Sequence, residues 1–275
     1  APEDFVLDAA EKAMVSAVSK AFRSAGKPVV VVLNVGGPIE VVSWRDQVDA
    51  ILVAWQPGQE AGHAVSDVLA GVVNPSGKLP MTFPRALKDL PAAQGFPGKV
   101  LEPGDSAQPM AGAKAAEVEY SDGIEVGYRS LRQRSAAPAY AFGHGLSYTS
   151  FEYGALSVTS NGGAPEHWTA TLAVTNRGKV PGAEVVQLYV SAPREGLPKP
   201  LIELRRFAKT QLLAPGQSQT LSFELGPREL ASFDEKASAW AVAAGTYMLQ
   251  AGASASDLRE KAPLRVAQAS NVSLE

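Results

Sequence analysis

Apolar residues recur with a helical period near the start of the chain. Four of them fall on one face of a predicted helix: Met14, Val15, Val18 and Phe22. Asp8 precedes this run and Glu11 follows three residues later, which is the spacing of a capping box. Gly26 is expected to end the helix. The pattern predicts an amphipathic helix that begins just after Asp8.

Two later runs are apolar at every position, Val29–Leu33 and Ala50–Ala54. Strands that are apolar on both faces are typical of parallel sheets covered on two sides, so we predict parallel neighbours. A short helix is predicted at 39–44 and a longer one at 59–70, closed by Gly71. This alternation predicts part of an open α/β sheet of the flavodoxin-like kind.

The periodicity fades between residues 84 and 137, where Pro-Gly pairs and small residues are frequent. So long a connection is uncommon as an idle loop inside a compact domain. We interpret residues 91–150 as a linker that wraps the surface, with one ordered piece at 120–129.

Beyond Phe151 the apolar positions alternate, which predicts half-buried antiparallel strands. Three triplets carry the pattern: Val186, Leu188 and Val190; Leu221, Phe223 and Leu225; Tyr247, Leu249 and Ala251. Turn-forming pairs such as Pro215-Gly216 separate them, so we predict a small β-sandwich of the fibronectin type III or immunoglobulin type. The predicted division is an α/β portion at 1–90, the linker at 91–150, the sandwich at 151–268 and a tail at 269–275.

Composition narrows the classes of function. The 275 residues carry a formal net charge of -3, and the lysines and arginines are dispersed, which argues against a nucleic-acid partner. No apolar run approaches the roughly 20 residues of a membrane helix. The chain has no cysteine, which excludes disulfides and thiolate chemistry but leaves the compartment open between periplasm or secretion and cytoplasm.

Three blocks of the sequence resemble the signature segments of glycoside hydrolase family 3. They span Lys27–Ser43, Ile51–Pro84 and Pro138–Phe151. The second is the most specific, with Trp55-Gln56-Pro57-Gly58-Gln59-Glu60 followed by Asn74-Pro75-Ser76-Gly77-Lys78-Leu79-Pro80. The third, Phe142-Gly143-His144-Gly145-Leu146-Ser147-Tyr148-Thr149, departs from the family at His144, where a tyrosine or phenylalanine is usual. The resemblance covers essentially the whole chain.

This resemblance implies a β-glucosidase built from an N-terminal barrel, an α/β sandwich domain and a fibronectin-like domain, of which only the last two are expected here. The family's retaining reaction uses an aspartate nucleophile, which belongs to the barrel, and a second carboxylic acid as acid/base. In such enzymes the acid/base glutamate lies shortly before the helix that here begins after Asp8. Its Gly-Glu-Gly motif does not occur in this sequence, so we expect no catalytic residue in this chain and no activity from the chain alone. No cofactor is implied.

Four residues are candidates for lining a substrate cleft: Asn34, Trp55, Gln56 and Glu60. Asn34 and Trp55 end their strands at the carboxyl edge, where ligands bind in open α/β sheets, although each could equally be a structural turn residue. Glu60 could act as a catalytic acid, or its charge could simply favour the first turn of a helix. His63 and His144 have no second ligand at metal spacing, so no metal site is expected.

Two functional classes stay open from the sequence. The first is part of a retaining exo-β-glucosidase whose barrel-bearing N-terminal portion, separate or cleaved, is the partner and covers a face near Asn34 and Trp55. The second is a non-catalytic module that binds carbohydrate or protein through the sandwich. Xylosidases, arabinosidases and exo-glucanases share the same blocks, so the sugar is not fixed. The partners expected under the first reading are a β-glucoside or oligosaccharide and, for the whole enzyme, a homodimer.

Overall fold

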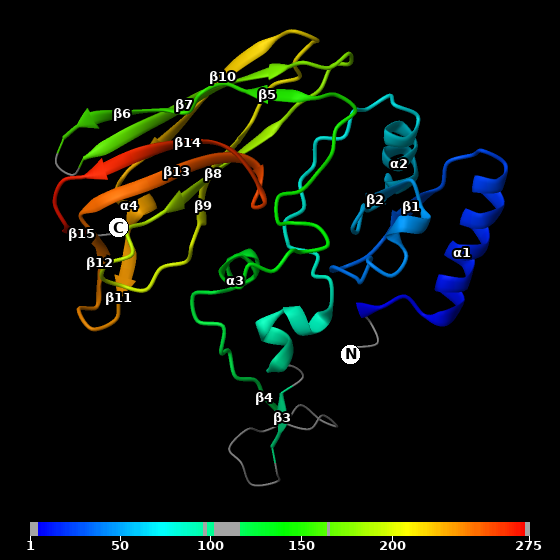
Figure 1. Cartoon of the computed structure of the whole chain (residues 1–275), viewed down its shortest axis with the longest axis horizontal. Coiled ribbons are helices and arrows are strands. Elements are labelled where there is room, and N and C mark those ends of the chain that lie inside the picture. The colour runs from blue at the N-terminus through cyan, green and yellow to red at the C-terminus, as the bar shows by residue number, and fades with distance from the viewer. Residues whose placement is uncertain (1–4, 96–97, 102–115, 164–165, 273–275) are drawn as a thin grey trace. The chain divides into compact units, whose positions relative to one another are not determined.

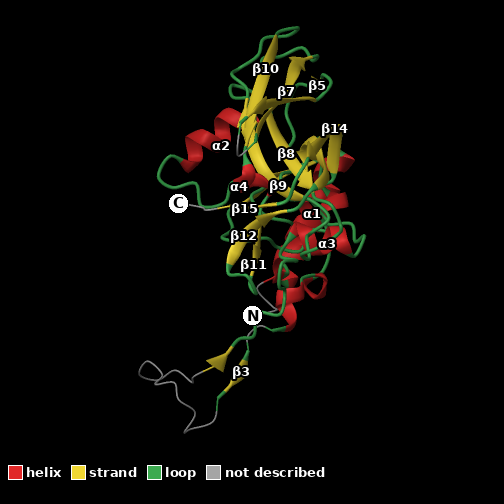
Figure 2. Ribbon diagram, turned by 90° about the vertical axis from the view of Figure 1, so that its left-hand side faces the viewer, coloured by secondary structure: helices red, strands yellow, loops and turns green. Residues whose placement is uncertain are grey.

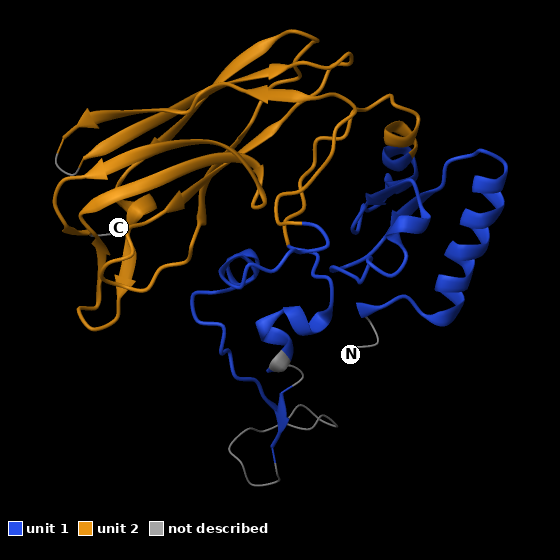
Figure 3. Ribbon diagram, in the orientation of Figure 1, with its two compact units in different colours: residues 1–65, 82–140 blue, residues 66–81, 141–275 orange. Residues whose placement is uncertain are grey.

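The computed structural model describes most of the chain (Figure 1) and divides it into two compact units (Figure 3). The described residues are 5–95, 98–101, 116–163 and 166–272. Unit 1 consists of residues 1–65 and 82–140, and unit 2 of residues 66–81 and 141–275. Within the described ranges, no helix is long and apolar enough to cross a membrane.

Unit 1 begins with helix α1 (Ala9–Ser24), whose start confirms the predicted capping box. The Glu11 N–H donates to Asp8 Oδ1 at 2.7 Å, and the Asp8 N–H donates to Glu11 Oε2 at 2.9 Å. These bonds satisfy two donors at the start of the helix. Gly26, with φ +66°, follows the helix end in the left-handed region that glycine adopts without strain.

Strands β1 (Val30–Leu33) and β2 (Ala50–Val53) are parallel neighbours, as predicted (Figure 1). The register pairs Val30 with Ala50 and Leu33 with Val53. Helix α2 (Ala61–Leu69) follows and confirms the second predicted helix, although it is shorter at both ends.

The apolar pattern of β1 is typical of a strand covered on both faces, but the described residues leave β1 partly exposed. Val30 and Val32 are 41% and 40% exposed. On α1, Met14 and Phe22 are 60% and 51% exposed. β1 and β2 form a two-stranded sheet, and no other described strand pairs with either, so the edges of the sheet are open as well.

The helix predicted at 39–44 is wrong. The Glu40 carboxylate instead accepts the Ser43 N–H at 2.7 Å and the Ser43 hydroxyl at 2.6 Å. Buried Trp44 donates its indole N–H to the Glu40 carbonyl at 2.8 Å. Such side-chain bonds offer the backbone an alternative to helical pairing, and only a 3-10 turn, Arg45–Gln47, follows.

Where the structure describes it, the connection after β2 and α2 consists of short elements. They are 3-10 turns at Leu87–Asp89 and Pro91–Gln94, the antiparallel pair β3 (Lys99–Val100) and β4 (Ala116–Glu117), and helix α3 (Tyr128–Gln133). Within 120–129, the piece predicted to be ordered, helix α3 begins at Tyr128, and Tyr120 is 88% exposed. Residues 111–115 of the small-residue stretch lie outside the described residues. The domain limits at 90 and 150 stay predictions.

Unit 2 contains the predicted β-sandwich (Figure 2). One sheet has the order β10-β7-β5, with β6 also on β7, and the other has the order β14-β13-β8-β9. The strands are β5 (Phe151–Tyr153), β6 (Ser157–Gly162), β7 (His167–Asn176), β8 (Val185–Ser191), β9 (Glu203–Lys209), β10 (Ser218–Leu225), β13 (Gly245–Ser254) and β14 (Asp257–Val266). Both sheets contribute to one core that includes Leu172, Leu188, Leu221, Leu249 and Leu264.

Strand β8 departs from the predicted alternation. Val186, Leu188 and Val190 are buried as predicted. The intervening Gln187 and Tyr189 are buried too, because the other face of β8 is also covered. The Gln187 amide donates to the carbonyls of Gly143 at 3.1 Å and Ala253 at 2.8 Å, and the Tyr189 hydroxyl donates to Gln187 Oε1 at 2.7 Å.

A smaller sheet includes part of the predicted tail. Strand β15 (Ser270–Val272) pairs with β12 (Ala239–Val242), which pairs with β11 (Ser232–Asp234) after the short helix α4 (Pro227–Leu230). Val272 packs against the sandwich core. A free tail is therefore wrong for residues 270–272, because strand pairing and apolar contact hold them.

Candidate functional site

The carboxyl edge of the parallel pair holds two of the residues proposed from sequence. Asn34 follows β1 and Trp55 lies two residues after β2. Parallel strands bring both to the same edge, and the Ala54 N–H continues the ladder by donating to the Leu33 carbonyl at 2.9 Å. The Asn34 side chain is exposed and Trp55 is half-buried. Both side chains therefore lie at the position where open α/β sheets bind ligands.

Trp55 has an unusual backbone conformation. Its φ of +56° lies in the left-handed region, which is costly for a bulky residue. The indole packs against Phe83, with ring centroids 6.0 Å apart and planes at 58°. Phe83 is buried and contacts Tyr140, at a centroid distance of 6.2 Å. This stack holds the indole at the strand end, and strained residues of this kind cluster at functional sites.

Gln56 and Glu60 complete the predicted set. Gln56 is exposed, and its Nε2 would lie 3.4 Å from a Cβ added to Gly36, so it reaches the loop after β1. Glu60 immediately precedes α2, and its carboxylate lies 2.9 Å from His63 Nδ1 in an exposed pair. Among the described residues, no hydrogen bond or ion pair links Glu60 to Asn34, Trp55 or Gln56. Asn34, Trp55 and Gln56 thus lie at one edge of the sheet, and Glu60 lies beside that edge.

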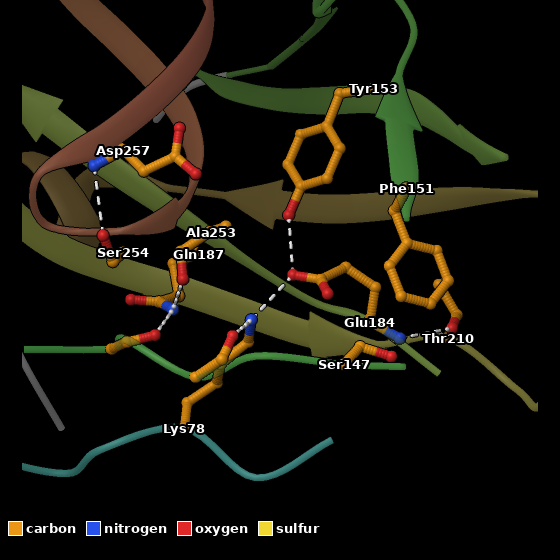
Figure 4. A network of polar contacts seen from close by, with 12 residues as sticks. Lys78, Ser147, Phe151, Tyr153, Glu184, Gln187, Thr210, Ala253, Ser254 and Asp257 are labelled. Atoms are coloured by element: carbon orange, nitrogen blue, oxygen red, sulfur yellow. Dashed lines mark hydrogen bonds and ion pairs between the residues drawn. The ribbon is translucent and has the colours of Figure 1, made fainter. Parts of the chain in front are cut away.

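A second polar cluster lies in unit 2, and the sequence did not indicate it (Figure 4). Lys78 Nζ is 3.0 Å from Glu184 Oε1, and both side chains are buried, at 11% and 6% exposed. The Tyr153 hydroxyl donates to the same Glu184 oxygen at 3.1 Å. Burial, followed by the charge of Glu184, raises the pKa of Tyr153 well above its ordinary value, so the hydroxyl remains a donor. Lys78 lies in the second sequence block, but no pattern linked it to Glu184.

A cavity of about 500 Å³ adjoins this cluster. Its lining includes Lys78, His144, Tyr153, Glu184, Asp257 and Arg259. Arg259 stacks on the Tyr153 ring, with the guanidinium carbon 4.6 Å from the centroid, and pairs with Asp257 at 2.7 Å. The opposite charges therefore neutralise one another within the wall. Separately, the described residues contain no group of three or more side chains that could hold a metal ion.

The described structure therefore combines an open α/β portion, whose parallel strands end at one edge, with a β-sandwich. The family model described as the glycosyl hydrolase family 3 C-terminal domain matches residues 2–148, and a fibronectin type III-like domain model matches residues 184–255. The chain belongs to glycosyl hydrolase family 3, as its C-terminal α/β domain followed by a fibronectin-like sandwich.

Relatives and solved structures agree with this assignment. A β-glucosidase from Rhizobium radiobacter is 44% identical over 84% of this chain, and β-glucosidase A from Butyrivibrio fibrisolvens is 39% identical over 93%. The chain spans 27% and 31% of the lengths of these relatives. The structure of β-glucosidase 3B from Thermotoga neapolitana in complex with glucose is 43% identical, with a TM-score of 0.86 over 97% of this chain and 35% of that one.

The surroundings of His144 predict how the stability of the folded chain depends on pH. Burial, followed by the positive charge of Lys78, lowers the pKa of His144, while Asp257 opposes the shift. Below about pH 6.5, the ordinary histidine value, the unfolded chain therefore binds more protons here than the folded chain. The stability that neutral His144 contributes is present above that pH and is lost as the pH falls.

We expect the variant His144→Phe, which restores a residue usual in the family, to lose less stability than the parent between pH 7 and pH 5. Urea unfolding at both pH values measures this difference. His63→Phe, at an exposed histidine, is the matched control and should follow the parent. Equal acid sensitivity of His144→Phe and the parent would contradict the prediction.

Proposed function

We propose that this chain is part of a retaining, exo-acting β-glucosidase that removes terminal non-reducing β-D-glucosyl residues. In this proposal the nucleophile lies on a barrel in an N-terminal portion of the same enzyme. The observation that carries it is the similarity, at about 40% identity over most of this chain, to proteins named β-glucosidase. Those relatives are more than three times as long as the chain, which supports a further portion of the enzyme.

The edge of the β1–β2 pair is the part of this chain that we propose to face the substrate. Asn34, Trp55 and Gln56 would line the cleft, and Glu60 would lie at its margin. The parallel edge, the positive φ of Trp55 and its aromatic support by Phe83 favour this role. In the proposal these residues bind and orient sugar, and the catalytic carboxylates come from outside this chain.

The exposed apolar residues of α1 and β1 are the proposed contact with the barrel-bearing portion. Met14, Phe22, Val30 and Val32 are each at least 40% exposed, and apolar surface of this kind commonly marks an interface. The partner would cover β1, which lies beside Asn34 in sequence. The domain limits at 90 and 150 and a homodimer of the whole enzyme belong to the same proposal.

One observation favours the alternative of a carbohydrate-binding module. Phe233 on β11 and Trp240 on β12 are cross-strand neighbours, with ring centroids 5.4 Å apart, and are 48% and 38% exposed. Exposed aromatic rings present large apolar surfaces on which a sugar could stack. The two proposals differ in which aromatic residue contacts sugar: Trp55 in the first and Trp240 in the second.

The first test is the activity of the chain alone. We expect the purified 275-residue chain not to hydrolyse aryl β-glucosides, because acid/base catalysis contributes about 10²–10⁴-fold and the nucleophile is also elsewhere. Adding the separately expressed barrel-bearing portion should restore turnover. Parallel assays with an aryl β-xyloside and an aryl α-arabinoside test which sugar the assembled enzyme accepts. Turnover by the highly purified chain alone would refute the assignment of both carboxylates to the other portion.

The second test is the substitution Trp55→Ala in the assembled enzyme. We expect kcat/KM for an aryl β-glucoside to fall about 10-fold, which corresponds to about 1.4 kcal/mol of lost binding at the edge. Trp55→Phe should recover most of the loss, because it keeps an aromatic ring against Phe83.

Trp240→Ala is the matched control, since it removes a half-exposed tryptophan from the small β11–β12–β15 sheet. It should leave kcat/KM unchanged. If Trp240→Ala weakens the binding of a soluble glucan while Trp55→Ala has no effect on turnover, the carbohydrate-binding alternative is the better account.

A further inference from the structure

The segment 74–80, which is part of the most specific sequence block, is held by the sandwich within unit 2. Asn74 makes bonds in two directions. Its Nδ2 donates to the Pro181 carbonyl at 2.9 Å, while its Oδ1 accepts the Ser147 hydroxyl at 2.9 Å and the Tyr148 N–H at 2.8 Å. One amide side chain thus joins the segment to the third sequence block and to the loop before β8.

Lys78 makes the second attachment. Its ammonium bridges Glu184, immediately before β8, and the Gly145 carbonyl, which it reaches at 3.1 Å. Glu184 is held in turn by the Tyr153 hydroxyl and by the bond from its own N–H to the Thr210 hydroxyl at 3.0 Å (Figure 4). Removing one partner of this pair would leave the other charge buried and unpaired, which is strongly destabilising, so the attached state requires both Lys78 and Glu184.

The backbones of the two blocks also meet directly. The Leu79 N–H donates to the His144 carbonyl, and the Gly143 N–H donates to the Leu79 carbonyl, both at 2.8 Å. A Cβ added to Gly145 would collide with the Gly77 carbonyl oxygen, whereas a Cβ added to Gly77 would meet nothing within 4 Å. The glycine at 145 is therefore required by close approach of the two segments.

These polar groups are not arranged as a ligand site. Lys78 is paired with Glu184, and Arg259 with Asp257, so the cavity wall already satisfies its own charges. The Tyr153 ring, which a sugar could otherwise use, is stacked under Arg259. The contacts bind one part of the chain to another.

We propose that Asn74 and Lys78 form a polar clamp that fastens segment 66–81 to the fibronectin-like sandwich. The sandwich is then a structural requirement for the most specific family segment, and not an independent appended module. Breaking the clamp opens segment 66–81 and residues 141–148 locally, while the sandwich core stays folded. This inference does not depend on the proposed activity.

Amide hydrogen exchange of the full chain tests the clamp. In Gly145→Ala, we expect the Leu79 and Gly143 amides to exchange about 10- to 100-fold faster, as for loss of one strong attachment. The core amides of β8 and β13 should keep their rates. Gly77→Ala, the same change on the facing segment where space is open, should leave all rates unchanged.

Lys78→Met tests the ion pair itself and should give the same local acceleration. Lys88→Met, at an exposed lysine, is its matched control. Unchanged exchange at Leu79 and Gly143 in both Gly145→Ala and Lys78→Met would overturn the proposal. Acceleration of the β8 and β13 amides by the same factor would also overturn it, because the opening would then be global.

Discussion

The β1–β2 pair is apolar on both faces, and the need to cover those faces is the constraint on which the arrangement of unit 1 depends. Two strands of four residues cannot form a complete sheet, and Val30 and Val32 remain about 40% exposed. Helix α1 adds Met14 and Phe22 to the exposed apolar surface. Such surface is costly in water and is normally buried against another element. The proposed N-terminal portion of a family 3 enzyme would satisfy this requirement at the edge that carries Asn34 and Trp55.

Unit 2 buries its apolar surface with its own residues. The contacts that do so show what the second and third sequence blocks contribute to the fold. The sandwich core is closed by residues from both sheets. The outer face of β8 is covered by the chain around Gly143, through buried Gln187. Lys78 then pairs with Glu184 at the start of the same strand. The glycines and polar residues of the second and third blocks thus serve packing and attachment, while Trp55 and its neighbours are the residues proposed for contact with substrate.

Local patterns predicted the elements that depend on neighbouring residues. The capping box at Asp8 and Glu11, the parallel pair and the alternation of Leu221, Phe223 and Leu225 all follow from short-range periodicity and turn chemistry. The 39–44 helix failed because the Glu40 side chain competes for the backbone of Ser43, which periodicity does not reveal.

Long-range pairing could not be predicted in the same way. Lys78 and Glu184 are more than 100 residues apart, and nothing in their local sequences distinguishes a buried ion pair from two exposed charges. The candidate edge was predicted because parallel strands end together, but its chemistry was not, because the catalytic carboxylates are proposed to lie outside this chain. The exposure of Val30 and Val32 likewise depends on which strands are present, not on the pattern of β1 itself.

Footprinting of exposed α1 residues most directly tests the claim that a barrel-bearing portion covers the apolar surface of α1 and β1. Hydroxyl-radical labelling of Met14 and Phe22 would be compared in the chain alone and in the chain assembled with the barrel-bearing portion. The account predicts that labelling of both falls several-fold on assembly, while Phe207 on β9, which is 70% exposed, labels equally in both states. Unchanged labelling of Met14 and Phe22 in an assembly that hydrolyses β-glucosides would contradict it.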